Sequence, residues 1–429
     1  MPINGEFIVS VLLGCIADDF TGATDLASFL VQSGMRTVQL IGVPTEPVDL
    51  SDTDAVVIAL KSRTLPSEVA VAQSIEALEW LKSLNCEQYY FKYCSTFDST
   101  EKGNIGPVTD ALLDNLKESF TILCPSLPVN GRTVYKGNLF VNDELLSESG
   151  MRNHPLTPMT DSNLMRVMAA QSSGKVGLVP FDIVSQGADR VKRALSKLAH
   201  EHRYAVVDTL SNNDLHVIGE ACADLMLLTG GSGLSVGLAK NFVDKGLFEI
   251  RNNSAELSKV KGEAVVLSGS CSVMTQKQVA RFKESFLSMK ISPLDLKSGK
   301  SSLADALTWF EKNRNVGALM FYATDTPENI RFVQEQLGVE QASELVENFM
   351  ADLVSALDKK GVTKFIVAGG ETSGAVVKAL NPSMLKIGAS IAPGVPITEI
   401  VGYSPKLIAL KSGNFGDELF FENALEMMQ

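Results

Sequence analysis

Residues 9–30 read VSVLLGCIADDFTGATDLASFL, and the character of this stretch changes at its centre. Its first part, 11–17, is an apolar run typical of a strand buried on both faces of a parallel sheet. Asp18 and Asp19 follow this run directly. Apolar residues at helical spacing then occur within 20–30 and predict a helix after a tight Thr-Gly turn. The stretch therefore predicts a strand, a turn and a helix, with two carboxylates at the carboxyl end of the strand.

These two carboxylates have a structural and a functional interpretation. An aspartate before a helix often only caps the helix, because its side chain accepts hydrogen bonds from free backbone N–H groups. A cap requires one carboxylate, and Asp18 and Asp19 are two. Ligands of open α/β sheets bind at the carboxyl ends of the strands. Asp18 or Asp19 is therefore a candidate to bind or deprotonate a substrate hydroxyl, or to hold a cation.

The composition is that of a globular protein with room for two domains. The chain has 429 residues, of which 45% are hydrophobic, and its formal net charge is −12. This charge argues against nucleic acid or an anionic membrane as the main partner. An anionic ligand must therefore be held by local groups. The composition leaves open whether the chain forms a homodimer.

The cysteines and the N-terminus favour a cytoplasmic protein. Six cysteines form no CxxC pair and no metal-ligand spacing, so we expect reduced thiols in the core. The segment 1–10 lacks a basic region and a cleavage site, and no run approaches 18 apolar residues. We therefore expect neither export nor a membrane span.

Apolar runs alternate with helical patterns along the whole chain. This alternation predicts an α/β fold with largely parallel sheets flanked by helices. The polar stretch 248–263 interrupts the pattern and marks a domain boundary. We expect an N-terminal domain over 1–250, with a polar ligand site, and a C-terminal domain over 262–429.

Polar residues follow two further strands of the N-terminal half. Lys61 and Arg63 come after the strand 55–60. These two cations could bind a carboxylate, or they could simply be solvated. The strand 88–93 contains Lys92 and continues into CSTFDSTEKG, with Ser95 and Thr96 among its hydroxyls. One hydroxyl is enough to cap the next helix. The others indicate a site for a polyol or a sugar acid, which requires many short hydrogen bonds.

Two more residues are weaker candidates. Lys136 lies in 132–141, which has the pattern of a hairpin arm. His154 lies in an irregular stretch too polar for a core. A single histidine is more often structural than catalytic, but its polar neighbours favour a place at a site.

The C-terminal half repeats one sequence pattern, an apolar strand followed by small residues and a helix. SGSCS follows the strand 264–267, GGETSG follows 364–368, and SGNFG follows 406–410. Backbone N–H groups in such turns bind anions, and a helix dipole favours negative charge there. Tight strand–helix packing is the alternative. Two such loops in one domain favour a nucleotide as the ligand. Neither of the common phosphate-binding motifs, GxxxxGK[ST] and GxGxxG, occurs in the chain, so we expect no P-loop.

Taken together, these motifs resemble the four-carbon acid sugar kinases, and within them the 3-oxo-tetronate 4-kinases. The resemblance spans nearly the whole chain. It rests on IADDFTGATDLA, KYCSTFDSTEKGNIGPV, YKGNLFV, HPLTPMTDSN and TGGSGL in the first half, and on LSGSCS, AGGETSGAV and KSGNFG in the second.

The resemblance implies a sugar-acid-binding N-terminal domain and a nucleotide-binding C-terminal domain in an ATP-dependent phosphotransferase. The implied reaction phosphorylates the C4 hydroxyl of a 3-oxo-tetronate, derived from erythronate or threonate, in sugar-acid catabolism. The ATP contacts implied by position are Ser268, Gly369, Gly370, Glu371, Thr372 and Gly413.

The residues then suggest roles in phosphoryl transfer. Asp18 or Asp19 would accept the hydroxyl proton, and the C-terminal loops would hold the ATP phosphates with Mg²⁺. The substrate carboxylate would be bound by Arg63 and Lys92. Two other functions stay open, a non-catalytic sugar-acid sensor and a nicotinamide-dependent oxidoreductase, and the missing glycine fingerprint counts against the second.

Overall fold

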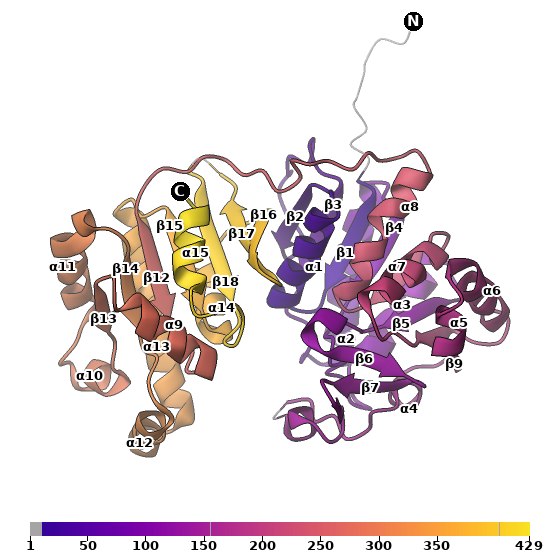
Figure 1. Ribbon diagram of the computed structural model, residues 1–429, viewed down its shortest axis with the longest axis horizontal. Helices are drawn as coiled ribbons and strands as arrows, with labels where there is room; N and C mark the ends of the chain where they lie inside the picture. The colour runs from indigo at the N-terminus through magenta and orange to yellow at the C-terminus, as the bar shows by residue number, and fades with distance from the viewer. Residues whose placement is uncertain (1–10, 155, 403) are drawn as a thin grey trace, which may run out of the picture. The chain divides into compact units, whose positions relative to one another are not determined.

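The computed structural model describes residues 11–154, 156–402 and 404–429. It divides into two compact units, with the division between Ala255 and Glu256. Residues 1–10, on which the expectation of no export sequence rests, lie outside the described residues. In each unit, helices flank a mostly parallel sheet, which confirms the predicted α/β class (Figure 1).

The N-terminal unit contains an eight-stranded sheet in the order β2-β3-β1-β4-β11-β5-β10-β9, and all its pairs are parallel. The strands are β1 (Leu13–Ala17), β2 (Thr37–Ile41), β3 (Ala55–Ala59), β4 (Gln88–Lys92), β5 (Thr121–Cys124), β9 (Val176–Val179), β10 (Tyr204–Val207) and β11 (Leu227–Gly230). β1 lies between β3 and β4, and all five of its residues are buried, as its apolar sequence predicts.

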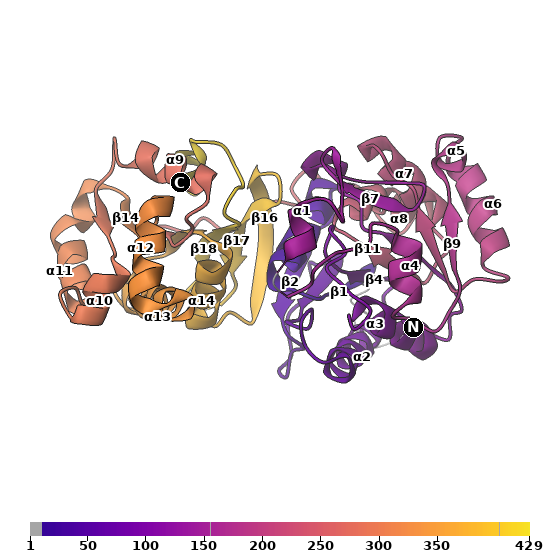
Figure 2. The same cartoon turned by 90° about the horizontal axis from the view of Figure 1, so that it is seen from below.

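Helices cover both faces of this sheet. They are α1 (Phe20–Gln32), α2 (Ser67–Ser83), α3 (Ile105–Leu116), α4 (Leu164–Ala169), α5 (Phe181–Val184), α6 (Ala188–Leu198), α7 (Asn212–Ala221) and α8 (Ala239–Asp244), with 3₁₀ turns η1 (Pro128–Asn130), η2 (Gly150–Asn153) and η3 (Gly233–Gly237). Figure 2 shows α1, α7 and α8 over one face and α2 and α3 over the other. The predicted apolar stripe of α1, Leu26, Phe29 and Leu30, is buried.

A small antiparallel sheet joins this unit. It consists of β6 (Arg132–Tyr135), β7 (Asn138–Val141) and β8 (Glu144–Leu145). The predicted hairpin arm 132–141 is thus a complete hairpin, and Lys136 lies in its turn with a φ of 50°. Asp208 holds this turn, because its carboxylate accepts hydrogen bonds from the backbone N–H groups of Lys136 and Gly137 at 2.7 and 2.8 Å.

The C-terminal unit contains a sheet in the order β13-β14-β12-β15-β18-β17-β16. Its strands are β12 (Ala264–Ser268), β13 (Ser288–Lys290), β14 (Leu319–Tyr322), β15 (Lys364–Ala368), β16 (Met384–Ala392), β17 (Val395–Ile400) and β18 (Lys406–Lys411). The first five strands in the sheet order are parallel, and β17 runs antiparallel to both of its neighbours.

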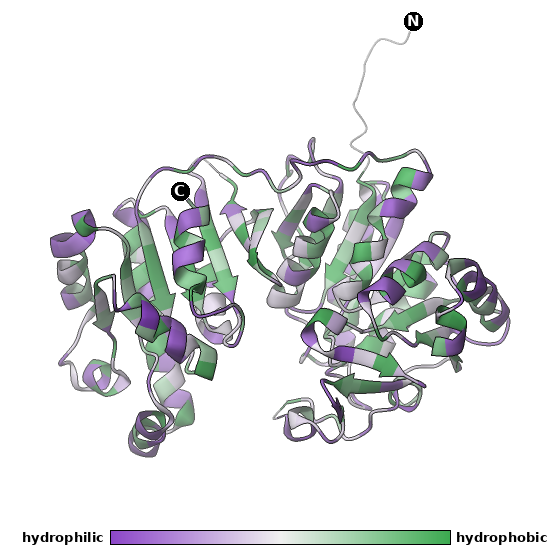
Figure 3. Ribbon diagram, viewed as in Figure 1, coloured by the Kyte–Doolittle hydropathy of each residue, from purple (hydrophilic) through white to green (hydrophobic). Residues whose placement is uncertain are grey.

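The helices of this unit are α9 (Val273–Phe282), α10 (Pro293–Ser298), α11 (Leu303–Asn313), α12 (Pro327–Leu337), α13 (Val339–Lys359), α14 (Gly370–Leu380) and α15 (Phe420–Met427), with the 3₁₀ turn η4 (Arg314–Val316). α9 and α15 lie over one face of the sheet, and α13 and α14 lie over the other (Figure 2). The central strands are hydrophobic and the outward helix faces are polar (Figure 3). Within the described residues, no helix is long and apolar enough to cross a membrane.

Candidate active site

The register of the N-terminal sheet brings three loops together. Ala17, the last residue of β1, pairs with Ala59 of β3 and with Lys92 of β4. The loops that begin at Asp18, Leu60 and Tyr93 therefore start side by side. The chain leaves β1 toward β2 and β3 and later crosses to β4, so this point is the topological switch where open α/β sheets bind ligands.

At this point Asp18 and Arg63 form a two-pronged ion pair. Arg63 Nε donates to Asp18 Oδ2 at 2.9 Å, and Nη2 donates to Asp18 Oδ1 at 2.8 Å. The backbone carbonyl of Asp18 also accepts from Arg63 N at 3.2 Å. The Asp18 side chain is only 7% exposed. Both of its carboxylate oxygens are therefore occupied, and this aspartate mainly fixes the guanidinium.

Asp19 combines a cap with a more open position. Its Oδ1 accepts from Gly22 N at 3.1 Å, which caps α1, and from Arg63 Nη2 at 2.6 Å. Its side chain is 29% exposed, against 7% for Asp18. Burial raises the pKa of Asp19 above its ordinary value, although the charge of Arg63 lowers it. The N-cap interpretation is thus correct for Asp19, and the same carboxylate is also the more accessible of the two.

Lys92 lies behind this cluster. Its side chain is buried, and Nζ donates to the carbonyl of Tyr93 at 2.7 Å. The charge of Lys92 lowers the pKa of both Asp19 and Asp25, whereas burial raises both. Asp25, on α1, accepts a hydrogen bond from the hydroxyl of Ser232 in the TGGSGL loop. Two motifs far apart in the sequence therefore meet beside Lys92.

The hydroxyl-rich loop after β4 is tightly constrained. Thr96 donates to Asp98 at 2.6 Å, and Asp98 lies 3.7 Å from Arg63 Nη1. Phe97 and Asp98 both have positive φ values, 63° and 31°. Such backbone conformations are costly in non-glycine residues and often occur at functional sites. Ser95 is half-buried, and among the described residues its hydroxyl has no hydrogen-bond partner.

Asn104 fastens the Arg63 loop to this region. Its side-chain amide donates to the carbonyls of Ser62, Arg63 and Leu65 at 2.8, 3.1 and 2.9 Å. Asn104 is not among the residues predicted from the sequence. Its position one residue before α3 is the only signal that could have drawn attention to it, and that signal suggests a cap.

Lys136 and His154 contact residues close to them in the sequence. Lys136 is exposed, and its ammonium group lies 5.4 Å from the ring centre of Tyr135. His154 Nδ1 accepts from Thr157 N at 3.1 Å and contacts the Thr157 hydroxyl at 2.9 Å. Within the described residues, neither side chain bonds to the Asp18–Arg63 cluster. Their predicted place at the substrate site stays a prediction.

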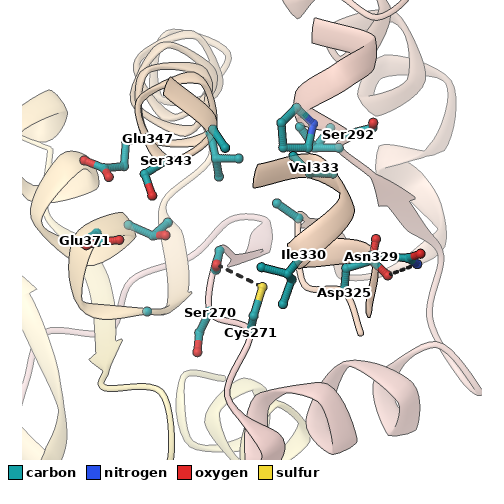
Figure 4. A pocket seen from close by; sticks show the side chains of 18 of the residues that line it. Ser270, Cys271, Ser292, Asp325, Asn329, Ile330, Val333, Ser343, Glu347 and Glu371 are labelled. Atoms are coloured by element: carbon teal, nitrogen blue, oxygen red, sulfur yellow. Dashed lines mark hydrogen bonds between the residues drawn. The ribbon is translucent and has the colours of Figure 1, made fainter. Parts of the chain in front are cut away.

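The C-terminal unit contains a cavity of about 710 Å³ at the carboxyl end of its parallel strands (Figure 4). Its lining includes two of the glycine loops, through Gly269–Cys271 and Gly369–Thr372. The register again explains this, because Ser268 of β12 pairs with Ala368 of β15. The remainder comes from β13, α10, α12 and α13 and from the segments that follow β13 and β14, with the residues Lys290, Ile291, Ser292, Pro293, Asp295, Ala323, Asp325, Asn329, Ile330, Val333, Gln334, Ala342, Ser343, Val346 and Glu347.

The N-terminus of α14 opens into this cavity. Gly369, which precedes the helix, has a φ of 122° and offers no side-chain cap. A Cβ added to Gly370 would meet no atom within 4 Å, so the space beside it is open. By contrast, the hydroxyl of Ser272 caps α9. The uncapped N–H groups of α14 therefore face a cavity, which is the arrangement that binds phosphates.

Other predicted nucleotide contacts lie behind this lining. Ser268 is fully buried, and its hydroxyl contacts that of Thr324 at 2.7 Å. The carbonyl of Gly413 accepts from Thr275 Oγ1 and from Lys411 Nζ, both at 2.7 Å. These positions suit residues that support the glycine loops. Lys411 is not among the residues predicted from the sequence, although it lies between the predicted strand 406–410 and SGNFG.

The polar side chains of the cavity include an ion pair. Asp325 pairs with Lys290 at 2.7 Å and accepts from Asn329 at 2.9 Å, and the pKa of Asp325 is lowered (Figure 4). Figure 4 also shows Ile330 and Val333 on α12 beside Ser343 and Glu347 on α13. Apolar side chains thus line one part of the cavity, and backbone loops line another. This division suits a ligand with a flat apolar ring and an anionic tail.

The described residues do not provide a protein-built metal centre, since they contain no group of three or more histidine, cysteine, aspartate or glutamate side chains able to hold an ion. Mg²⁺ does not require one, because it usually keeps several waters and is bound by substrate phosphates with one or two carboxylates. Two carboxylates of the cavity lining adjoin the glycine loops, because Glu371 belongs to GGETSG and Asp325 contacts Cys271. The residues present therefore fit a metal that enters with a nucleotide.

Comparison with known proteins agrees with the division of the chain into an N-terminal and a C-terminal unit. A family model described as a sugar-binding N-terminal domain matches residues 13–238, and one described as a nucleotide-binding C-terminal domain matches residues 265–421. A Burkholderia multivorans 3-oxo-tetronate kinase is 54% identical over 418 residues, which cover 97% of each chain. The Haemophilus influenzae 3-oxo-tetronate kinase is 51% identical and covers 97% of this chain and 100% of its own.

The chain belongs to the four-carbon acid sugar kinase family. Solved structures support the fold of this family. A Salmonella typhimurium LT2 protein, provisionally named a tRNA synthase, is 47% identical with a TM-score of 0.91 and covers 98% of this chain and 100% of its own. Haemophilus influenzae protein HI1011 is 50% identical with a TM-score of 0.85, and covers 97% and 100%.

Proposed function

We propose that this protein is a kinase that transfers the γ-phosphate of ATP to the C4 hydroxyl of a four-carbon 3-oxo sugar acid. The observation that carries the proposal is the cavity of the C-terminal unit, in which the uncapped N-terminus of α14 and the Gly269–Cys271 loop provide an anion site. Membership of the sugar kinase family and the names of the relatives support the substrate class.

In this reaction the phosphorus forms a bond to the C4 oxygen and its bond to the bridging oxygen of ADP breaks. The hydroxyl proton must go to a base, and Asp19 is the better candidate of the two aspartates. Its carboxylate is more exposed, and burial raises its pKa, which favours proton acceptance. Asp18 then acts as a positioning residue, because both of its oxygens hold Arg63.

The sugar acid requires cationic and hydroxyl-binding groups. Arg63 already uses Nε and Nη2 on the two aspartates, so a substrate carboxylate would bind at Nη1, where Asp98 lies 3.7 Å away. Lys92 is buried near Asp19 and supplies positive charge. The hydroxyl of Ser95 has no hydrogen-bond partner among the described residues and could bind the substrate. Thr96, Lys136 and His154 complete the proposed set. Mg²⁺ would neutralise charge on the ATP phosphates, and Glu371 or Asp325 would be its protein partner.

The deciding experiment is an ATP-consumption screen with the purified protein over four-carbon acids and 3-oxo acids, followed by mapping of the phosphorylated carbon. ADP formation with a 3-oxo-tetronate and phosphate on C4 are expected. Binding of such an acid without ADP formation would favour a non-catalytic sensor instead. The same proposal includes a cytoplasmic location and leaves a homodimer to be tested by light scattering.

A further inference from the structure

A lysine for which the described residues supply no counter-ion is buried next to the glycine loops of the C-terminal unit. Lys411 ends β18 and is 1% exposed. Its ammonium group donates to Gly413 O at 2.7 Å, to Thr275 Oγ1 at 3.0 Å and to Ser412 O at 3.3 Å. Nζ also lies 5.7 Å from the ring centre of Phe420. All of these partners are neutral.

The charged side chains of α9, the helix that carries Thr275, pair with residues other than Lys411. On α9, Lys277 pairs with Glu418 at 3.0 Å, and Arg281 lies 3.7 Å from Glu422 of α15. Within the part of the chain that the structure describes, no carboxylate is in ion-pair distance of Lys411. Burial without a counter-charge lowers the pKa of Lys411 to about 8.

Lys411 also lies where three loops meet. Its backbone carbonyl accepts from Gly369 N at 2.9 Å, which anchors the start of the GGETSG loop. The ammonium group holds Gly413, and a Cβ added to Gly413 would lie 2.7 Å from Ser270 Oγ. Ser270 and Gly369 both line the cavity. The loop that the ammonium group holds therefore packs against Ser270, which is part of the cavity lining.

We propose that Lys411 supplies the buried positive charge of the phosphate site and takes up a proton from solvent when the phosphates of a nucleotide bind. This inference rests on the proposed function. A bound anion favours the protonated ammonium, because opposite charges attract strongly away from bulk water. By linkage, protonated Lys411 must bind the anion more tightly than neutral Lys411 does. Nucleotide affinity should therefore fall as Lys411 loses its proton.

Other titratable groups at the cavity can be separated from Lys411. Cys271 lines the cavity, and burial raises the pKa of its thiol above the ordinary 9.0, so it titrates at higher pH. Lys290 is paired with Asp325. Glu347 and Glu371 are carboxylates, which are ionised in the alkaline range. The variant Cys271→Ser removes a second group of the cavity lining whose proton uptake could be confused with that of Lys411.

The test is isothermal titration calorimetry at pH 8.5 in two buffers with different ionisation heats. The probe is the ATP analogue AMP-PNP with Mg²⁺, and adenosine is the control ligand because it lacks phosphates. The wild-type protein should take up a large fraction of one proton on binding AMP-PNP and none on binding adenosine. The uptake should persist in Cys271→Ser. Above pH 8, affinity for AMP-PNP should fall by about 10-fold per pH unit.

Three variants complete the design. Lys411→Met should abolish proton uptake and weaken AMP-PNP binding at pH 7 by at least about 10-fold. Lys411→Arg keeps a charge that does not titrate, so any binding it retains should be independent of pH up to 10. Lys364→Met is the matched control, because Lys364 is also buried in this sheet but begins β15, at the end away from the loops. It should retain wild-type proton uptake.

The outcomes distinguish the two proposals. If wild-type protein binds no AMP-PNP, the proposed function fails. If it binds AMP-PNP without proton uptake, or if Lys411→Met binds with unchanged uptake, the role of Lys411 is wrong and the nucleotide site stands. The wild-type measurement needs no folded variant, so a Lys411→Met protein that fails to fold would not prevent this decision.

Discussion

The two candidate sites use opposite means to organise charge. In the N-terminal unit, charged side chains neutralise one another, and Arg63 holds Asp18 and Asp19 with Asp98 nearby. In the C-terminal unit, backbone N–H groups and small residues of two loops line one part of the cavity, and the buried Lys411 has only neutral hydrogen-bond partners among the described residues. The first arrangement fixes the direction of a proton acceptor. The second leaves positive potential unsatisfied, which is what a polyanionic ligand requires.

The largest effect should come from the proton acceptor. Asp19→Asn should lower kcat by about 10²–10⁴-fold, because an amide cannot accept the proton. Asparagine caps helices as well as aspartate does, so α1 should be preserved. Nucleotide affinity, measured by calorimetry, should stay within about twofold. Asp18→Asn is the companion variant, and near-normal turnover in both variants would exclude a base at this pair.

The next effect tests the geometry of Arg63. Arg63→Lys keeps the charge but loses the planar fork that bonds both aspartates, so kcat/KM for the sugar acid should fall by about 10–100-fold. Arg166→Lys is the matched control, since Arg166 makes a similar two-pronged pair with Asp161 but is 67% exposed. Steady-state kinetics should show the control within about twofold of wild type. Equal effects in the two variants would contradict a special role for Arg63.

A smaller effect should separate nucleotide binding from chemistry. Gly370→Ala places a methyl group in the open space beside the α14 N-terminus and should raise KM for ATP by about 10-fold, or roughly 1.4 kcal/mol, with kcat little changed. Gly374→Ala, one turn further along α14, also meets no atom within 4 Å and should leave KM unchanged. An unchanged KM in Gly370→Ala would remove this loop from the ATP site.

The smallest effect should be on stability. The pKa of Lys411 is about 8 in the folded protein and 10.5 for an ordinary lysine. Between these values the unfolded chain binds more protons, so the stability of the wild type rises with pH. Urea unfolding without nucleotide should show wild type gaining about 1 kcal/mol relative to Lys411→Met between pH 8 and pH 9.5. A constant difference across this range would mean that Lys411 is not titrating.

Prediction from sequence was most successful where one strand and its following loop carry the information. The apolar runs predicted the strands, and the small residues after them predicted the two loops that line the cavity. The α/β class is confirmed for the same reason. The roles of Asp18 and Asp19 could not be separated, because their difference depends on Arg63, which lies more than forty residues later and occupies both oxygens of only one of them.

The amino-acid sequence by itself determined the family, the alternation of strands and helices, and the ends of strands at which polar and glycine-rich loops gather. These properties depend on local periodicity and on motifs whose spacing is visible in the chain. Only the tertiary structure decided that Asp19 is the more open carboxylate, that Asn104 fastens the Arg63 loop, and that Lys411 is buried without a counter-ion. Burial and pairing depend on residues brought together by sheet register, and a linear sequence does not contain that proximity.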